Sequence, residues 1–313
     1  MEYVLLIGGL VILIISGEAL VRGAVGIALK FNISTLVIGM TIVSFGTSVP
    51  ELLVSLKAAI AGHSEIAIGN VVGSNIANIA LVLGLTTIIL PIKVKSSTVK
   101  IDWPIMMVST ILFYLFSLNE NIEWYEGLIF TIGLIAFNLF MFGKFKKGNI
   151  KEDVDLDIEI DQNKPPKILF NLFLIAAGSI GLAFGTDWLL NGSIQIATDF
   201  GVSEHIIGVT IVAFGTSVPE LITCIVASVK KQTDISVGNL IGSNIFNILG
   251  VLGITSLIKE IPVSLQVIHV DAFWLLAVSF IIFPLMIIGN KINRIRGLLL
   301  FVSYCIYIYF VVS

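Results

Sequence analysis

The chain has 313 residues, of which 57% are hydrophobic and only 12% are charged, and its mean hydropathy is +1.03. A soluble domain has about 25% charged residues, so this composition excludes an ordinary soluble globular protein and indicates a polytopic membrane protein. The net charge of −3 disfavours nucleic acid as a partner, because nucleic-acid-binding domains are usually basic.

The first element is a hydrophobic stretch at the N-terminus. It lacks the basic start and the cleavage site of a signal peptide, so we expect it to be the first membrane helix. A helix needs about 20 apolar residues to cross a bilayer, and runs of this kind predict about ten spans. The expected spans are 2–28, 33–61, 65–90, 103–118, 124–143, 168–191, 203–230, 235–258, 270–289 and 294–312.

A polar segment at 144–167 divides the chain. It contains lysines, an acidic run at 152–161 and two prolines, but not the spacing or the glycine of an EF-hand loop. A solvated linker is therefore favoured over a cation site. We expect two five-helix repeats, 1–143 and 168–313, joined by this linker.

The basic residues of the loops predict the orientation. If the N-terminus lies outside, nearly all loop lysines and arginines fall inside, and only Lys57 and Lys259 fall outside. We therefore expect a multi-pass cell-membrane protein with both termini outside and the linker in the cytoplasm.

Two segments, Phe45–Glu51 and Phe214–Glu220, have the same seven residues, with an offset of 220 − 51 = 169. At this offset Gly73–Ile76 also matches Gly242–Ile245. Each expected half has an odd number of spans, so the second half enters the membrane from the opposite side. The pattern predicts an all-α membrane protein of ten transmembrane helices, arranged as two inverted-topology five-helix repeats around a site near the bilayer midplane.

Polar residues in the second span of each half indicate a cation site. Thr47 and Glu51 are four residues apart and share a helix face. Pro50 has no N–H group, so it should kink this core helix and free carbonyls from Ser44 onward. The matching proline should act in the same way near Ala213. Freed carbonyls at membrane depth need a partner, and a bound cation is a suitable one.

The third span of each half adds a hydroxyl and an amide spaced four residues apart, at Ser74 and Asn78 and at Ser243 and Asn247. Hydrogen bonds between helices are one explanation for these residues. Their position beside the glutamate-bearing segments in both halves favours the other, a role as ligands.

The candidate donor atoms are all oxygens, from carboxylates, hydroxyls, amides and loosened carbonyls. Such ligands suit Ca²⁺, Na⁺ or Mg²⁺ rather than Zn²⁺ or Cu⁺, and Mg²⁺ is disfavoured because it requires rigid octahedral geometry. Two carboxylates would neutralise one Ca²⁺. No Walker motif and no serine with a histidine partner is present, so we expect neither an enzyme nor a cofactor. Cys224 and Cys305 lie in apolar runs and are expected as buried free thiols.

Several other polar residues are expected to have structural roles. Asn75 and Asn244 are expected to bridge helices. Glu18 matches Asp187 at the repeat offset, and its spacing from Arg22 favours an ion pair within one helix.

Through these motifs the chain resembles the sodium/calcium exchanger family of the cation/Ca²⁺ exchanger superfamily, particularly its prokaryotic members. The two alpha-repeats of that family match 38–84 and 207–253. The resemblance implies that Glu51 and Glu220 are the main Ca²⁺ ligands and also serve Na⁺. It also implies hydroxyl or backbone oxygens from Thr47, Ser48, Thr216 and Ser217, flanking Na⁺ sites at Ser74 and Ser243 with the carbonyls of Ser44 and Ala213, and central polar roles for Asn78 and Asn247.

The resemblance further implies exchange of several Na⁺ for one Ca²⁺ by alternating access, with the first and sixth helices moving across the core. Some relatives carry aspartate where this chain has Asn247, and the loss of that charge disfavours K⁺ coupling. We therefore expect an antiporter whose partners are Ca²⁺, Na⁺ and the lipid bilayer. The alternatives are an H⁺/Ca²⁺ exchanger, a K⁺-dependent Na⁺/Ca²⁺ exchanger and a passive cation channel.

Overall fold

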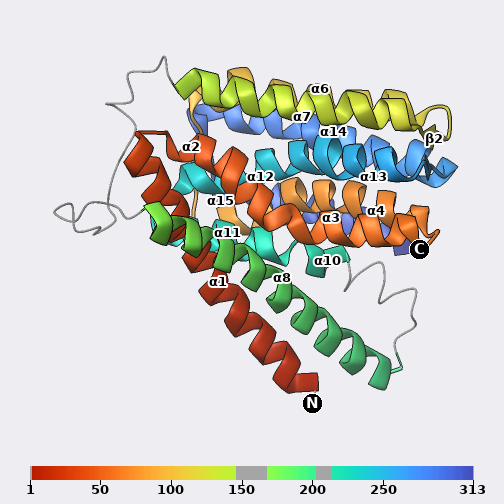
Figure 1. The fold of residues 1–313 in the computed structure, drawn as a ribbon, viewed down its shortest axis with the longest axis horizontal. Helices are drawn as coiled ribbons and strands as arrows, with labels where there is room; N and C mark the ends of the chain where they lie inside the picture. Colours follow the sequence, from red (N-terminus) through yellow and green to blue (C-terminus); the bar gives the residue numbers. More distant parts are fainter. Residues whose placement is uncertain (1, 146–167, 202–212, 313) are drawn as a thin grey trace.

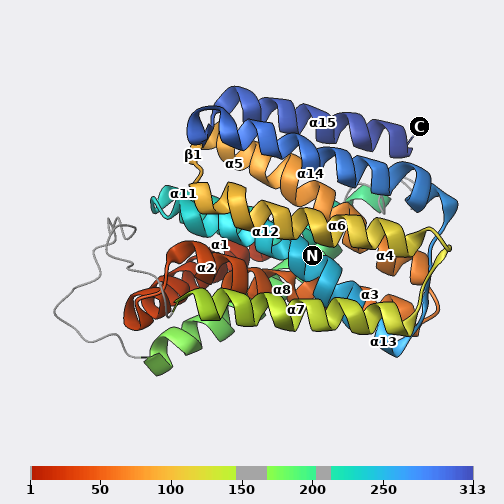
Figure 2. The same ribbon diagram turned by 90° about the horizontal axis from the view of Figure 1, so that it is seen from above.

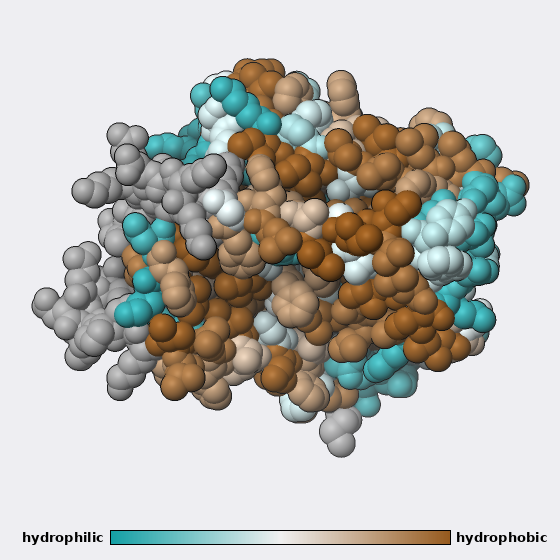
Figure 3. All heavy atoms as spheres, turned by 45° about the horizontal axis from the view of Figure 1, so that its top comes forward, coloured by the Kyte–Doolittle hydropathy of each residue, from teal (hydrophilic) through white to brown (hydrophobic). Residues whose placement is uncertain are grey.

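The computed structural model describes residues 2–145, 168–201 and 213–312, and almost all of them are helical. In Figure 3, apolar side chains cover most of the face in view, and hydrophilic ones lie mainly toward its edges. Within the described ranges, nine helical runs are long and apolar enough to cross a membrane. They are Glu2–Phe31, Thr35–Ile60, Ser64–Ile89, Thr98–Ser117, Trp124–Gly143, Ile168–Asp199, Thr233–Ile258, Val267–Asn290 and Arg294–Val311.

The expected seventh span, 203–230, is not among these nine runs. Its residues up to 212 lie outside the described part of the chain, as does most of the expected linker. The described remainder forms two short helices, α10 (Ala213–Thr216) and α11 (Val218–Val229). The sixth span runs to Asp199 rather than to the expected residue 191. The additional turns pack closely against α1, since a Cβ on Gly192 would lie 2.7 Å from a backbone oxygen of α1.

Several spans consist of α-helix interrupted by a π-helical segment. Such segments free backbone groups from the regular ladder and often occur at functional sites. The π-helical segments are η1 (Gly39–Val43), η2 (Ala77–Val82), η3 (Thr98–Asp102), η6 (Asn247–Leu252) and η7 (Val267–Asp271). The remaining helices are α1 (Glu2–Phe31), α2 (Thr35–Ile38), α3 (Ser44–Ile60), α4 (Ser64–Ile76), α5 (Leu83–Ile89), α6 (Trp103–Ser117), α7 (Trp124–Phe145), α8 (Ile168–Asp199), α12 (Thr233–Phe246), α13 (Gly253–Ile258), α14 (Ala272–Ile287), the short 3₁₀ turn η8 (Ile288–Asn290) and α15 (Arg294–Val312).

Two pairs of short strands show that the halves are related by inversion. Strand β1 (Ile92–Lys93) pairs antiparallel with β4 (Lys291–Ile292), and β2 (Asn121–Ile122) pairs with β3 (Ile261–Pro262). The repeat offset maps β1 onto β3, since 92 + 169 = 261, and maps β2 to within one residue of β4, since 121 + 169 = 290. Each pair combines a strand of one half with a strand of the other. The two pairs lie at opposite ends of the molecule, so β1 and its repeat counterpart β3 are at opposite ends (Figures 1 and 2). The inverted topology expected from the sequence is thus present in the strand pairing.

The helices α1 and α8 lie side by side and cross the other helices obliquely (Figure 1). Their backbones approach closely, because a Cβ on Gly178 of α8 would lie 2.7 Å from the backbone nitrogen of Leu20 on α1. A similar close approach joins α2 to α12, where a Cβ on Gly238 would lie 2.3 Å from the carbonyl oxygen of Leu36. The contact between α2 and α12 brings the second span of the first half against the third span of the second half.

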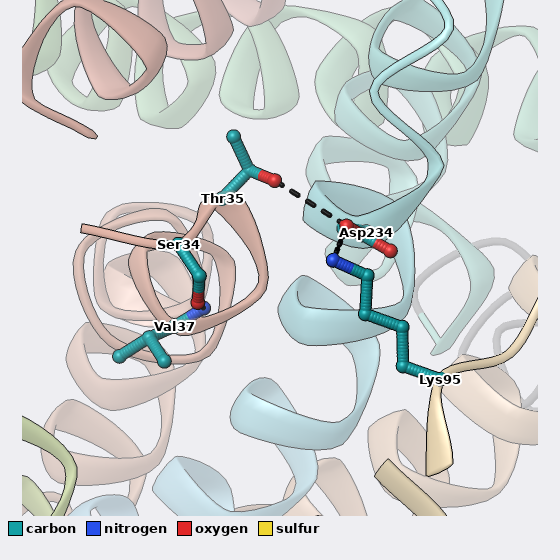
Figure 4. A network of polar contacts seen from close by, with 5 residues as sticks. All are labelled: Ser34, Thr35, Val37, Lys95 and Asp234. Carbon is teal, nitrogen blue, oxygen red and sulfur yellow. Dashed lines mark hydrogen bonds and ion pairs between the residues drawn. The ribbon is translucent and has the colours of Figure 1, made fainter. Parts of the chain in front are cut away.

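Polar side chains tie three elements together at the end of the molecule where α2 and α12 begin (Figure 4). The ammonium of Lys95, in the loop after β1, lies 2.8 Å from the carboxylate of Asp234 in the first turn of α12. The hydroxyl of Thr35, the first residue of α2, lies 3.5 Å from the same carboxylate, and Ser34 caps α2. These contacts fix the starts of two core helices relative to each other.

Two expectations about isolated side chains are wrong. Cys224 is buried, but Cys305 is exposed, since α15 lies at the periphery of the bundle; both thiols are free. The carboxylate of Glu18 forms its ion pair with Lys230 at 2.6 Å, and not with Arg22 on the same helix. The spacing along one helix could not reveal a partner that is distant in sequence.

Candidate cation site

Two carboxylates lie at the centre of the candidate site, Glu51 on α3 and Glu220 on α11. Both side chains are fully buried. Neither oxygen of Glu51 has a hydrogen-bond partner among the described residues, and neither does Oε2 of Glu220. Burying a carboxylate without a partner costs several kcal/mol or more, so this pair requires a cation or a proton.

Glu220 is held by hydroxyl groups from two other helices. The hydroxyl of Ser48 on α3 donates to Oε1 of Glu220 at 3.2 Å, and that of Ser243 on α12 donates to the same oxygen at 3.4 Å. The carboxylate of the second half is thereby linked to the signature segment of the first half. The other oxygen of this carboxylate remains available to a ligand.

Two hydroxyl pairs flank the carboxylates and are related by the repeat. Thr47 lies 3.4 Å from Ser243, and Ser74 lies 3.4 Å from Thr216, oxygen to oxygen. The offset of 169 maps Thr47 onto Thr216 and Ser74 onto Ser243. The hydroxyl of Thr47 also contacts the amide oxygen of Asn239 at 3.0 Å. These pairs join the second span of each half to the third span of the other, so the structure brings the predicted hydroxyls together.

Four asparagines cross between α4–η2 and α12–η6. Asn78 donates to the amide oxygen of Asn244 at 3.2 Å, and Asn247 donates to that of Asn75 at 3.1 Å. Asn75 and Asn244 in turn donate to each other's backbone oxygens at 3.4 and 3.3 Å, so the expectation that they bridge helices is confirmed. This network orients Asn78 and Asn247, whose own amide oxygens are buried and have no partner among the described residues.

The backbone around the signature segments differs between the halves. In the first half α3 continues through Pro50, and an irregular turn precedes α3 in η1. In the second half the helix is interrupted at Ser217, whose φ of −90° and ψ of 1° are not helical. Ser44 begins α3, and its carbonyl accepts a 3.3 Å bond from the hydroxyl of Thr47. Ala213 begins α10, and its side chain lies outside the described part of the structure.

Six buried oxygens of the predicted ligand set therefore lack a hydrogen-bond partner among the described residues. They are both carboxylate oxygens of Glu51, Oε2 of Glu220, the hydroxyl of Ser217 and the amide oxygens of Asn78 and Asn247. Buried polar atoms are nearly always paired, so a group of unpaired oxygens marks a place for a positively charged ligand. No histidine or cysteine belongs to this group, and the donor chemistry fits a hard cation.

The sequence suggested only backbone hydrogen bonds for Asn70 and Asn239, and two contributions to this site go beyond what it indicated. The first is Asn239, whose amide oxygen accepts a hydrogen bond from Thr47. The second is the pair of π-helical segments η2 and η6, which carry Asn78 and Asn247. The duplication of Asn70 at Asn239 was the available signal for the former. No residue pattern indicates a π-helical turn.

A cavity of about 1220 Å³ lies beside this region. It lies between α3, α7 and α8, and Ser44 and Thr216 are on its wall. Its lining is otherwise mostly apolar. The cavity therefore reaches the flank of the candidate site at these two residues.

Comparison with known proteins gives consistent matches over nearly the whole chain. The family model described as sodium/calcium exchanger protein matches residues 1–143 and 170–313. A putative antiporter, CaxA, of Alkalimonas amylolytica is 35% identical, over 97% of each chain. The sodium/calcium exchanger MaX1 of Methanosarcina acetivorans is 31% identical, over 97% of this chain and 96% of its own. A solved structure of the sodium-calcium exchanger NCX_Mj, soaked with Na⁺ and Sr²⁺, superposes with a TM-score of 0.84 at 32% identity and covers 98% of this chain and 97% of its own.

Proposed function

We propose that this chain, which belongs to the sodium/calcium exchanger protein family, is a secondary active antiporter that exchanges Na⁺ for Ca²⁺ by alternating access. The family is one of transporters, and in this proposal the ions are substrates rather than cofactors. The observation that carries the proposal is the pair of buried carboxylates surrounded by unpaired oxygens. Such a site is unfavourable when empty and favourable when a cation neutralises it.

In this proposal Glu51 and Glu220 are the main Ca²⁺ ligands and also serve Na⁺. Their combined charge of −2 balances one Ca²⁺. The remaining oxygen donors are the side chains of Thr47, Ser48, Ser74, Asn78, Thr216, Ser217, Ser243 and Asn247, with the carbonyls of Ser44 and Ala213. Na⁺ accepts the same kinds of oxygen, so Na⁺ and Ca²⁺ would compete for overlapping positions. Mutually exclusive occupancy of this kind couples the movement of one ion to that of the other.

Proton coupling is the second candidate, and a specific observation favours it. Three buried oxygens of the two carboxylates have no hydrogen-bond partner among the described residues, and a proton satisfies such a group as a cation does. An H⁺/Ca²⁺ exchanger would use that proton in place of Na⁺. Potassium coupling has less support, since Asn247 is a neutral amide.

We also infer the orientation and the domain boundaries. The positions of the loop lysines and arginines favour N- and C-termini outside and residues 144–167 in the cytoplasm. Residues 1–143 and 168–313 would then be the two inverted repeats.

The test is an ion-replacement flux assay in proteoliposomes. Vesicles loaded with Na⁺ should take up ⁴⁵Ca²⁺ when diluted into medium without Na⁺, and vesicles with choline inside should not. Uptake driven by a pH gradient without Na⁺ would favour the proton exchanger. Flux that needs no counter-ion would instead support a passive channel and reject antiport.

A further inference from the structure

Two carboxylates outside the candidate site occupy matching positions in the repeats. Glu18 on α1 and Asp187 on α8 are related by the offset, since 18 + 169 = 187. Each lies in the middle third of a long membrane-spanning helix, and each is exposed. A charged side chain at such a position is costly unless it is paired or hydrated. Glu18 is paired with Lys230, which follows the last residue of α11, at 2.6 Å.

Asp187 has no ion pair among the described residues, although a lysine lies in the corresponding place. The repeat counterpart of Lys230 is residue 61, since 230 − 169 = 61, and Lys57 is four residues before it, on the same helix face. Lys57 and Asp187 both line the cavity between α3 and α8. The repeat-related positions thus hold the components of a similar ion pair, with one residue from each half, and both residues face the cavity.

The packing around these charges shows the same asymmetry. On the paired side α1 and α11 are in contact, because a Cβ on Gly17 would lie 3.0 Å from the side chain of Ile222. The repeat counterparts of these residues are Thr186 and Leu53, since 17 + 169 = 186 and 222 − 169 = 53. Both counterparts line the cavity. At the level of these charges the interface of α1 with α11 is therefore closed, whereas its counterpart between α8 and α3 faces the cavity, although α3 and α8 touch nearer to Gly46.

We propose that Glu18–Lys230 and Asp187–Lys57 are alternative ion pairs that stabilise opposite states of the transport cycle. The proposal rests on alternating access as the proposed function. Because α1 and α8 pack closely, we treat them as one unit that moves relative to α3 and α11. In the state described here the unit is held against α11 by Glu18 and Lys230. Movement that closes the cavity would bring Asp187 to Lys57 and separate the first pair.

These four residues would act as positioning residues and not as ion ligands. They lie outside the group of buried oxygens around Glu51 and Glu220. Their effect should therefore be a change in the populations of two states, with the cation site itself intact. An exposed ion pair contributes about 0.2–1 kcal/mol, enough to change a population ratio by up to roughly fivefold.

The test uses cysteine labelling of the full chain in detergent, so its outcome does not depend on membrane orientation. Cys305 is exposed and is first replaced in Cys305→Ser, whereas Cys224 is buried and can remain. Single reporter cysteines are then introduced at Leu53→Cys, on the cavity wall, and at the counterpart Ile222→Cys. The labelling rates with a fluorescent maleimide report which interface is open.

Glu18→Gln removes the pair of the present state. Labelling at Leu53→Cys should fall and labelling at Ile222→Cys should rise, changing their ratio by roughly two- to fivefold. Asp187→Asn removes the pair of the opposite state and should change the ratio in the reverse direction. If one of these variants fails to fold, Lys230→Met and Lys57→Met test the same two pairs. Shifts in the same direction for both pairs, or an unchanged ratio, would overturn the proposal.

Two controls separate ion pairing from a general loss of charge. Lys259→Met removes a loop lysine that has no ion pair among the described residues, and it should leave the ratio unchanged. The charge exchange Glu18→Lys with Lys230→Glu should restore the wild-type ratio. Flux measured in the same proteins separates the two proposals. If Na⁺-driven flux is absent but the two pairs shift labelling in opposite directions, only the Na⁺/Ca²⁺ assignment is rejected. If flux is normal but the labelling ratio is constant, only the ion-pair proposal is rejected.

Discussion

The hydroxyl of Ser48 on α3 donates a 3.2 Å hydrogen bond to the carboxylate of Glu220 on α11, so one repeat supports the acidic group of the other. The repeat-related hydroxyl of Ser217 has no partner among the described residues, and neither do the carboxylate oxygens of Glu51. The halves are therefore alike in sequence but unequal in how their polar groups are paired. Glu51 has more oxygen atoms free for a cation than Glu220.

This inequality leads to a prediction for Glu51→Gln. Removal of one of two buried carboxylates should weaken Ca²⁺ binding by about 100-fold or more, because about 3 kcal/mol is lost when one charge of a buried ion pair is removed. In buffer without Na⁺ or Ca²⁺ the same variant should melt at a higher temperature than wild type, since it no longer buries an unpaired charge. Titration calorimetry and thermal unfolding measure these effects. Glu65→Gln, at the exposed start of α4, is the matched control and should change neither.

Ser48→Ala and Ser217→Ala form a second comparison. The first removes a hydrogen bond to a carboxylate and should lower the free energy of unfolding without ions by about 1–2 kcal/mol. The second removes an unpaired hydroxyl, so ion-free stability should be unchanged while ion affinity falls. Equal loss of ion-free stability in the two variants would contradict the unequal pairing.

The third prediction concerns pH. Carboxylate ligands must be deprotonated to bind a metal, so protons and Ca²⁺ compete and Ca²⁺ affinity should fall on acidification. Each competing proton can reduce the apparent affinity by up to about tenfold per pH unit. The measurement is ⁴⁵Ca²⁺ binding to purified protein between pH 5 and 8. A constant affinity over that range would be inconsistent with a site built on Glu51 and Glu220.

A fourth prediction tests the close approach of α2 and α12. Gly238→Ala would place a Cβ 2.3 Å from the carbonyl of Leu36, so the helices must separate. We expect a loss of about 1–3 kcal/mol in the free energy of unfolding, the usual effect of overpacking. The control Gly143→Ala adds a methyl group where nothing lies within 4 Å, and it should be neutral or slightly stabilising. Equal stability of the two variants would argue against this contact.

Much of the fold could be predicted from the sequence, because hydrophobic length sets the spans and the duplicated segments set their relation. The offset that aligns Glu51 with Glu220 also aligns the hydroxyl pairs that meet in the structure. An isolated polar residue in an apolar helix can have many explanations. Two copies in register restrict them to one arrangement.

Other features required coordinates. The prolines of the two signature segments predict the same kink in both halves, yet α3 is continuous through Pro50, whereas the helix of the second half is interrupted at Ser217. Local rules give both copies the same expectation, so the difference must come from packing. The partner of Glu18 was also inaccessible, because Lys230 is distant in sequence and only the packing of α1 on α11 brings it near.

Calorimetric titration of the purified chain with Ca²⁺, with and without Na⁺, shows whether Glu51 and Glu220 hold the cation. We expect one Ca²⁺ bound per chain and displaced by Na⁺, and binding weakened by about 100-fold or more in either Glu51→Gln or Glu220→Gln. If the double variant Glu51→Gln/Glu220→Gln still binds Ca²⁺ with wild-type affinity, the paired carboxylates are not the cation site.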